Sequence, residues 1–167
     1  MLLLIQCITQ KQEFERGCIT LENIVFRKAT EKDLPQIINL QTRIFNGEQK
    51  IPSGDISEFL ARKPQCWCAV LNNIVIGAVA AWKENNVVHW GRFVTDPDYR
   101  GNRIGTQIAQ MSFDDLFAQG IEEIYMDART VTAKIVCKMG GQIVGEPEPF
   151  YVGTVTPVIL RKSNYHH

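Results

Sequence analysis

The sequence predicts a single α/β domain built on a mixed sheet, and three observations carry this prediction. Apolar runs and helical patterns follow one another in the order βαα βββ αβαββ. Hydrophobic residues make up 45% and charged residues 22% of the 167 positions, a balance typical of a soluble one-domain globular chain. A charged, glycine-bearing junction at 96–106, DPDYRGNRIGT, separates a strand pattern from a helix pattern. We find no internal repeat, low-complexity segment or linker.

The N-terminal elements are a strand and two helices. The strand is predicted at Asn23–Arg27, where NIVFR is rich in β-branched and aromatic residues. A helix should follow with Thr30 as its N-cap, because Asp33 stands three residues on. Four apolar residues then fall near one helical face: Leu34, Ile37, Ile38 and Ile44. After the break at GEQKIPSGD we expect a short second helix, capped by Ser53 or Asp55.

Three consecutive strands are predicted in the middle of the chain. The segment Cys66–Trp82 reads CWCAVLNNIVIGAVAAW, two apolar runs that are joined by Asn72 and Asn73. Because asparagine tolerates a positive φ, this pair suits a tight hairpin. Val87–Thr95 is again extended, and the simplest arrangement of the three strands is antiparallel.

The C-terminal half alternates helices and strands. Five residues of its first helix form one apolar arc: Ile104, Ile108, Met111, Ser112 and Leu116. Gly120 should end this helix, and a strand is predicted over 121–128. A shorter helix over 130–139 stops at a pair of glycines. Two last strands are predicted over 142–144 and 155–160.

The two ends of the chain are expected to lie outside the domain, which we place at residues 23–162. Residues 1–22 should form an N-terminal extension, either a flexible arm or an added first strand, and residues 163–167 a C-terminal tail. The initial MLLLI is too short for a signal peptide, and no run approaches the roughly 20 apolar residues of a membrane span. We therefore expect a cytoplasmic protein without a membrane partner.

Charge and cysteine content exclude several classes of protein. Eighteen basic and eighteen acidic residues leave no net charge, so the broad basic surface of a nucleic-acid binder is missing. The five cysteines are widely spread and suit a reduced protein better than a disulfide framework. Cys66 and Cys68 have no second pair at zinc-site spacing. We interpret them as buried small apolar residues and expect no metal.

The junction at 96–106 has the features of an anion site. A loop that leads from a strand into a helix leaves the first helical amides unpaired, at the positive end of the helix dipole. Gly101 and Gly105 let the backbone approach an anion closely, while Arg100 and Arg103 can neutralise it. The Gly-Lys-Ser/Thr ending of a P-loop and the three glycines of a dinucleotide fingerprint are both missing. A pyrophosphate is the ligand that we expect.

The stretch GRFVTDPDYRGNRIGTQIA resembles the acyl-CoA-binding motif of the GCN5-related N-acetyltransferases, the GNAT family, which reads Q/R-x-x-G-x-G/A. Arg100 takes the Q/R position and Gly105 the last glycine, whereas Arg103 replaces the middle glycine. The resemblance covers residues 23–162. IFNGEQKIP and GEPEPF are also similar to segments of small bacterial members with an EQ-x-x-P element. The resemblance implies a GNAT-like mixed, splayed central sheet of about six to seven strands, flanked by about four helices.

The same resemblance implies which residues bind acetyl-CoA as a co-substrate. The backbone of Phe93, Val94 and Thr95 would contact the pantetheine arm. Arg100 would flank the pyrophosphate, and six residues would cradle it: Gly101, Asn102, Arg103, Ile104, Gly105 and Thr106. The second partner would be an amine acceptor, and a homodimer is compatible with the sequence.

The acid of the reaction departs from the family pattern. Family members commonly use a tyrosine in the helix after the fifth strand to protonate the leaving thiolate. Alignment on the Lys-Met-Gly of this chain puts Val136 or Cys137 at that position. The family's asparagine at the start of the helix falls on Arg129 or Thr130. Tyr151 is an alternative proton donor if its loop folds over the thiol.

Two residues are candidate bases. His89 lies four residues before Phe93, which places both on one face of a strand with a period of two. Histidine suits the role because its side chain exchanges protons near neutral pH, although a surface histidine is the competing interpretation. Glu48 is the second candidate, unless it pins the GEQKIP loop by accepting backbone hydrogen bonds. Arg92 would hold a substrate carboxylate or form a structural ion pair.

Two functions remain open on this sequence. The first is an N-acetyltransferase that moves an acetyl group from acetyl-CoA to a primary amine of a small molecule or peptide. The second is a non-catalytic acyl-CoA-binding sensor that keeps the cradle and lacks the acid. Acidic residues in the loops expected around the acceptor would favour a cationic amine. These residues are Glu48, Asp55, Glu146 and Glu148.

Overall fold

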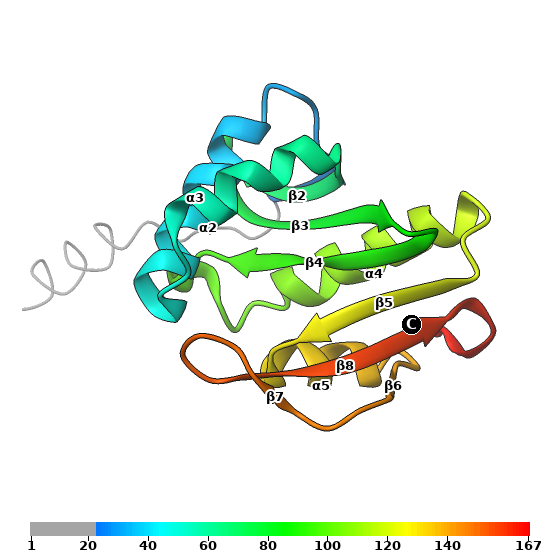
Figure 1. Cartoon of the computed structure of the whole chain (residues 1–167). Helices are drawn as coiled ribbons and strands as arrows, with labels where there is room; N and C mark the ends of the chain where they lie inside the picture. The colour runs from blue at the N-terminus through cyan, green and yellow to red at the C-terminus, as the bar shows by residue number, and fades with distance from the viewer. Residues whose placement is uncertain (1–22) are drawn as a thin grey trace, which may run out of the picture.

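The computed structural model describes residues 23–167, which form an eight-stranded mixed sheet with helices on both faces (Figure 1). The strand order is β1-β2-β3-β4-β5-β8-β6, and β7 pairs with β8. Neighbouring strands are antiparallel except β4 and β5, which are parallel. The predicted N-terminal extension, with Cys7 and Cys18, lies outside the described residues. The α/β class and the mixed sheet are confirmed.

The elements follow the predicted order with one additional strand. The strands are β1 (Val25–Lys28), β2 (Gln65–Leu71), β3 (Ile74–Glu84), β4 (Val87–Thr95), β5 (Glu123–Ala128), β6 (Gln142–Ile143), β7 (Glu148–Pro149) and β8 (Thr154–Arg161). The α-helices are α2 (Leu34–Gln49), α3 (Ser53–Ser57), α4 (Ile104–Ala118) and α5 (Thr130–Cys137). Strand β7 escapes prediction because the two prolines of GEPEPF argue against a strand.

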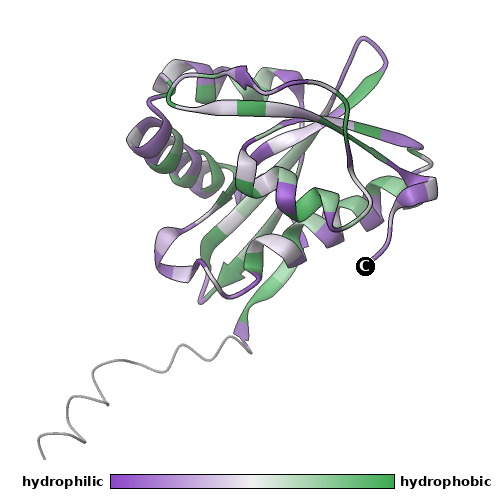
Figure 2. Cartoon of the chain, turned by 90° about the horizontal axis from the view of Figure 1, so that it is seen from below, coloured by the Kyte–Doolittle hydropathy of each residue, from purple (hydrophilic) through white to green (hydrophobic). Residues whose placement is uncertain are grey.

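Helices α2 and α3 cover one face of the sheet, while α4 and α5 cover the other (Figure 1). Each layer encloses a hydrophobic core, and Figure 2 shows hydrophobic residues gathered on the strands and on the helix sides that face them. Cys66 and Cys68 of β2 belong to the core under α2, and Trp67 belongs to the core under α4. Burial raises the pKa of each thiol to about 11. The interpretation of both cysteines as buried apolar residues is confirmed.

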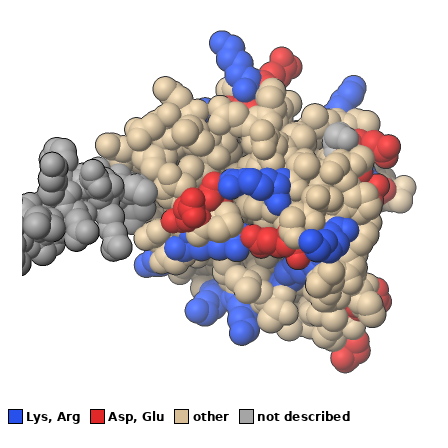
Figure 3. All heavy atoms as spheres, turned by 90° about the vertical axis from the view of Figure 1, so that its left-hand side faces the viewer, with Lys and Arg blue, Asp and Glu red and all other residues tan. Residues whose placement is uncertain are grey.

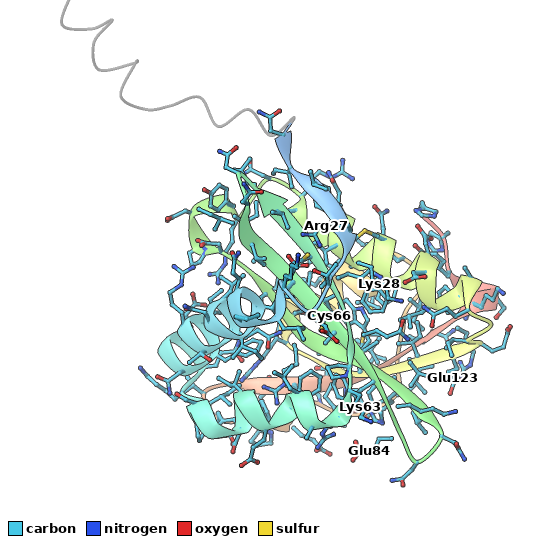
Figure 4. All side chains as sticks on the ribbon, turned by 90° about the horizontal axis from the view of Figure 1, so that it is seen from above. Arg27, Lys28, Lys63, Cys66, Glu84 and Glu123 are labelled. Atoms are coloured by element: carbon cyan, nitrogen blue, oxygen red, sulfur yellow. The ribbon has the colours of Figure 1, made fainter. Side chains whose placement is uncertain are left out.

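An ion pair fixes the start of α2. The carboxylate of Asp33 accepts hydrogen bonds from Nη1 and Nη2 of Arg27, at 2.7 and 2.8 Å, and from the N–H and hydroxyl of Thr30. Arg27 is labelled on β1 in Figure 4. Its hydrogen bonds hold the pKa of Asp33 well below the usual range. The helix begins at Leu34, and Thr30 donates to Asp33 instead of capping the first turn, so the predicted N-cap is wrong.

Two pairs of asparagines form the tight turns between the central strands. Asn72 and Asn73 join β2 to β3 with φ angles of 49° and 64°. Asn85 and Asn86 join β3 to β4 with φ angles of 49° and 66°. Two consecutive residues with positive φ form the two-residue hairpin turn whose twist matches that of the flanking strands. The predicted hairpin at 72–73 is therefore confirmed.

Strands β4 and β5 diverge toward their C-terminal ends, which opens the sheet on the left of Figure 1. The ladder between them consists of one pair, His89 with Tyr125. Beyond this pair, the edge of β4 that faces β5 has no strand partner among residues 23–167. The splayed sheet expected from the sequence is therefore confirmed.

A β-bulge in β4 lies at this opening. The register against β3 shifts here, and Arg92 takes a left-handed φ of 54°. Side chains beyond the bulge exchange faces: His89 stacks on Trp82 on the α2 side, whereas Phe93 packs against Gly105 of α4. The predicted placement of His89 and Phe93 on one face is wrong, because the period of two holds only along a regular strand.

Indole hydrogen bonds and the C-terminus hold α4 in place. Trp90 donates from Nε1 to Ser112 Oγ at 2.9 Å, inside the core. The segment expected as a tail, 163–167, packs against the same helix: Tyr165 donates its hydroxyl to Asp114 Oδ1 at 2.9 Å and stacks on Phe117. These contacts hold the middle and the C-terminal end of α4 in place.

Candidate functional site

The predicted anion site lies where β4 leads into α4, at the open end of the sheet. The first hydrogen bond of α4 runs from the Gln107 N–H to the Arg103 carbonyl, at 3.0 Å. The amides of residues 104–106 therefore have no acceptor within the helix. The first turn contains no acidic side chain. An anion can thus approach free N–H groups at the positive end of the helix dipole.

Three residues of this junction depend on unusual backbone or close packing. Gly101 has a φ of 83° and Arg103 a φ of 59°, both in the left-handed region. Arg103 thus adopts the conformation that favours glycine. The family motif has a glycine at this position. A Cβ on Gly105 would lie 2.9 Å from the Phe93 ring, so glycine at this position brings α4 close to β4.

The two arginines of the junction differ in their partners. Arg100 donates from Nη2 to both carboxylate oxygens of Glu48, at 3.0 and 3.1 Å, and from Nε to the Thr95 carbonyl. Arg103 is exposed and forms no ion pair with any residue in the described part of the chain. Figure 3 looks onto this end of the molecule and shows basic and acidic side chains side by side. A phosphate would meet Arg103 directly but would compete with Glu48 for Arg100.

A cavity of about 540 Å³, here named the cradle cavity, lies beside the junction. Nine of the ten residues predicted to bind acetyl-CoA line it: Phe93, Val94, Thr95, Arg100, Gly101, Arg103, Ile104, Gly105 and Thr106. The tenth, Asn102, donates its side-chain amide to the Tyr99 carbonyl at 3.1 Å and so closes the loop. The predicted residues therefore lie together around one hollow.

A second cavity of about 360 Å³, the central cavity, lies between the diverging strands β4 and β5. Its walls are largely aromatic: Phe45, Trp82, Trp90, Phe93, Phe150 and Tyr151. Four charged residues also line it, besides His89: Asp55, Arg92, Asp127 and Arg129. The residues that line it come from both helical layers, from four strands and from the loop between β7 and β8. The cavity therefore exists only in the folded chain.

His89 lies on the wall of the central cavity. Its ring stacks on Trp82, with 5.6 Å between centroids, and meets the edge of Tyr125 at 5.4 Å. Tyr125 donates its hydroxyl to Asp127 Oδ1 at 2.8 Å, and burial raises the pKa of Tyr125 to about 12. The imidazole nitrogens form no hydrogen bond with a residue between 23 and 167.

A hydrogen bond fastens the C-terminal loop over the central cavity. Tyr151, with a φ of 47°, donates its hydroxyl to Asp55 Oδ2 of α3 at 3.0 Å. This hydrogen bond raises the pKa of the Tyr151 hydroxyl. Arg92 donates to the backbone carbonyl of Asp55 at 3.0 Å and stacks over Phe59. Within residues 23–167, Arg92 forms no ion pair.

The three predicted catalytic residues do not lie together. His89 and Tyr151 line the central cavity, but the Tyr151 hydroxyl is engaged by Asp55. Glu48 lines the cradle cavity, where it binds Arg100. Geometry therefore separates the two candidate bases and places His89 nearer to any group bound between β4 and β5.

Helix α5 presents no tyrosine, histidine or cysteine to either cavity. Val136 is fully buried, and Cys137 packs against the core under α4. The α5 side chains that line the cavities are Val131, Thr132 and Ile135. Neither position aligned with the family tyrosine therefore lines a cavity.

Four residues line both cavities: Gln49, Phe93, Arg129 and Thr132. Arg129, the N-cap residue of α5, carries the charge among them. It donates from Nε to Gln49 Oε1 at 3.2 Å and from Nη1 to the Val152 carbonyl at 3.0 Å. The guanidinium also stacks over Phe150 at 5.1 Å. Arg129 therefore links the end of α2, the start of α5 and the C-terminal loop.

Sequence reasoning misses several residues of the central cavity. Tyr125 and Asp127 lie on one face near the end of β5. Their spacing of two residues within a predicted strand was the signal that could have placed both side chains on that face. Glu146 and Glu148 line neither cavity. Of the four acidic residues expected around the acceptor, Asp55 lines the central cavity together with Asp127, and Glu48 lines the cradle cavity.

Between residues 23 and 167, no helix has the length and apolar character needed to cross a membrane. In the same range, no three His, Cys, Asp or Glu side chains come close enough to share a metal ion.

Comparison with known proteins gives a family match and several similar folds. Residues 34–139 match the model of the acetyltransferase (GNAT) family. No curated protein sequence gives a significant match. ElaA from Escherichia coli is 17% identical with a TM-score of 0.70, and the alignment covers 81% of this chain and 97% of ElaA. A GCN5-related N-acetyltransferase from Kribbella flavida is 18% identical with a TM-score of 0.69, covering 84% and 98%.

A third solved structure contains a bound ligand. It is the NatC complex bound to Gag peptide and CoA, in which one chain is 19% identical with a TM-score of 0.67. The alignment covers 83% of this chain and 98% of that one. At such identities, these structures establish the shared fold.

Proposed function

The chain belongs to the GNAT acetyltransferase family, and we propose that it transfers an acetyl group from acetyl-CoA to a primary amine of a small molecule or a peptide. The observation that carries the proposal is the junction of the two cavities, which share Phe93, Arg129 and Thr132. A thioester and an amine bound on either side would meet there. The proposal includes a cytoplasmic location, because the unpaired cysteines suit a reducing compartment.

The cradle cavity fits the chemistry of acetyl-CoA. Its unpaired amides at 104–106 and the side chain of Arg103 would bind the pyrophosphate. The unpaired edge of β4 at Phe93–Thr95 would offer N–H and C=O groups to the amides of the pantetheine arm. Because the backbone supplies much of this binding, the protein needs no broad basic surface.

The central cavity fits a cationic amine. Asp55 and Asp127 line it, and neither forms an ion pair with a residue in the described part of the chain. The aromatic walls limit access of water, which strengthens attraction between a carboxylate and an ammonium group. His89 would take the proton from the attacking nitrogen, directly or through a water molecule. In this assignment Tyr151 holds the loop closed and Glu48 holds Arg100.

A non-catalytic acyl-CoA sensor is the second candidate function. The observation that favours it is the burial of Val136 at the position of the family tyrosine. A sensor would keep the cradle cavity and bind acyl-CoA without releasing thiol.

Thiol release from acetyl-CoA, measured across a panel of primary amines, tests the proposal. The panel should contain diamines, aromatic amines and peptides with free N-termini. We expect one class to release thiol faster than the amine-free reaction, and Arg103→Glu to weaken CoA binding by about tenfold or more. Lys83→Glu, a charge reversal on β3 outside both cavities, is the matched control.

Each outcome decides between the candidates. Binding of acetyl-CoA without thiol release for any amine would favour the sensor. Equal CoA affinity of Arg103→Glu and the wild type would show that the cradle cavity is not the pyrophosphate site.

A further inference from the structure

Arg129 has a free donor at the junction of the two cavities. Nη2 of Arg129 is buried and has no hydrogen-bond partner among residues 23–167, although Nε and Nη1 are both engaged. The same guanidinium forms no ion pair within this range. Burial lowers the pKa of Arg129, but arginine keeps its charge in proteins. Arg129 as a whole is half-buried, so the cost falls on this one buried donor, and a negatively charged ligand that accepts from Nη2 would recover it.

The surroundings of Arg129 hold the guanidinium in one orientation. Gln49 binds it from the end of α2, the Val152 carbonyl from the C-terminal loop, and the Phe150 ring lies against its plane. A charge that is fixed before the reaction stabilises a developing negative charge without any cost of reorganisation. The contacts of Arg129 therefore suit electrostatic catalysis better than binding of a mobile surface anion.

The reaction proposed above produces a negative charge at this junction. Attack of an amine on a thioester ends with an electron pair on sulfur, and that charge needs a proton or a nearby cation. Val136 and Cys137 supply no acid, because one is buried and the other lines neither cavity. Tyr151 already donates its hydroxyl to Asp55, and the raised pKa of this hydroxyl makes proton release harder.

We propose that Arg129 stabilises the leaving thiolate and so replaces the missing acid, an inference that rests on the transferase function proposed above. The amine nitrogen bonds to the acetyl carbon, and the carbon–sulfur bond breaks. Its electron pair passes to sulfur, where the Arg129 guanidinium balances the charge. The proton lost by the nitrogen goes to His89 or to water. CoA then leaves as the thiolate and takes its proton from solvent.

Titration of the thiol of bound CoA tests this role without an acceptor. Ultraviolet absorbance reports the thiolate, and desulfo-CoA, which lacks the sulfur, provides the baseline and an independent measure of binding. With Arg129 nearby, we expect the bound thiol to ionise about one to two pH units below that of free CoA. In Arg129→Gln this lowering should disappear, whereas Arg129→Lys should keep part of it. Arg161→Gln, which removes an exposed arginine outside both cavities, should match the wild type.

The outcomes separate this inference from the proposed function. Failure of the wild type to bind either CoA or desulfo-CoA would overturn the cradle assignment. If the wild type binds CoA normally but the bound thiol ionises as in free CoA, the role of Arg129 alone is overturned. This outcome is measured on the wild type, so it does not depend on whether any variant folds. A raised acceptor KM in Arg129→Gln, with an unchanged thiol titration, would also overturn it, because Arg129 would then bind a carboxylate of the acceptor.

Turnover provides a second readout once an acceptor is known. We expect Arg129→Gln to lower kcat by about a hundredfold at saturating substrates, since an interaction made only in the transition state affects kcat. Arg129→Lys should recover part of the loss. A kcat equal to that of the wild type would contradict the proposal.

Discussion

The cradle cavity and the central cavity adjoin, yet they are built in different ways. Most of the cradle cavity comes from one continuous stretch, 93–106, and its main features are backbone features: free amides, two left-handed residues and a glycine under an aromatic ring. The central cavity collects side chains from α2, α3, β3, β4, β5, α5 and the C-terminal loop. One cavity is local in the chain and the other is assembled by the whole fold.

The two cavities should respond differently to substitution. A loop can keep its backbone conformation under a different side chain: Arg103 has a left-handed φ of 59° at the position where the family motif has a glycine. A site made of side chains changes its ligand with single substitutions. Variants of the cradle cavity should therefore change the affinity for CoA, whereas variants of the central cavity should change kcat or the acceptor KM.

His89→Gln should have the largest effect of the four substitutions, and this effect should be confined to the central cavity. Loss of a general base lowers kcat by about a hundredfold or more. Affinity for CoA, measured by calorimetry, should stay within about twofold of the wild type, since His89 lines only the central cavity. An unchanged kcat would remove His89 from the mechanism.

Gly105→Val should act mainly on the cradle cavity, through the Phe93 ring that both cavities share. Its new side chain would press on the Phe93 ring, which lies 2.9 Å from the position of a Cβ. Overpacking of about 2 kcal/mol would weaken CoA binding by about thirtyfold. Gly47→Val is the matched control, because no atom lies within 4 Å of a Cβ at that position. Equal affinities of the two variants would contradict the close packing of α4 on β4.

Tyr151→Phe should raise the acceptor KM by about fivefold, as expected for a lost hydrogen bond worth about 1 kcal/mol. This substitution removes the hydroxyl that joins the C-terminal loop to Asp55 and leaves the ring in place. The kcat value decides between two roles of the hydroxyl. A fall in kcat of tenfold or more would identify Tyr151 as the proton donor, whereas we expect a change only in KM.

Glu48→Gln should give the smallest effect, with the opposite sign. Release of Arg100 from its exposed partner should strengthen CoA binding by about two- to threefold at low salt. This gain should shrink as salt screens the charges. If kcat instead falls about a hundredfold, Glu48 is the base and the two cavities cooperate more closely than their separation suggests.

The sequence reveals the local cavity far better than the assembled one. Gly101, Arg103 and Gly105 are close together in the chain, so their spacing predicts an anion site before the fold is known. Asp127 and Arg129 carry no such signal, because the strand divergence that brings them to His89 is a property of the sheet. The bulge at Arg92 adds a second obstacle, since one extra residue reverses the face of every side chain after it. The strands and helices follow from hydrophobic period and turn residues, whereas β7 and the start of α2 depend on tertiary contacts.

The ladder between β4 and β5 has a single pair, His89 with Tyr125, and this short ladder divides the sheet into two halves. One half carries β1 to β4, and the other carries β5 to β8. Few backbone hydrogen bonds join the facing edges of β4 and β5, so the two halves are held together by their shared core under α4 and by the hydrogen bonds of Arg129 to Gln49 and of Tyr151 to Asp55. Amide hydrogens on the facing edges of β4 and β5 should therefore exchange faster than those of β2 and β3. A ligand that contacts both halves should slow this exchange, so its binding can be followed by the exchange rates of these amide hydrogens.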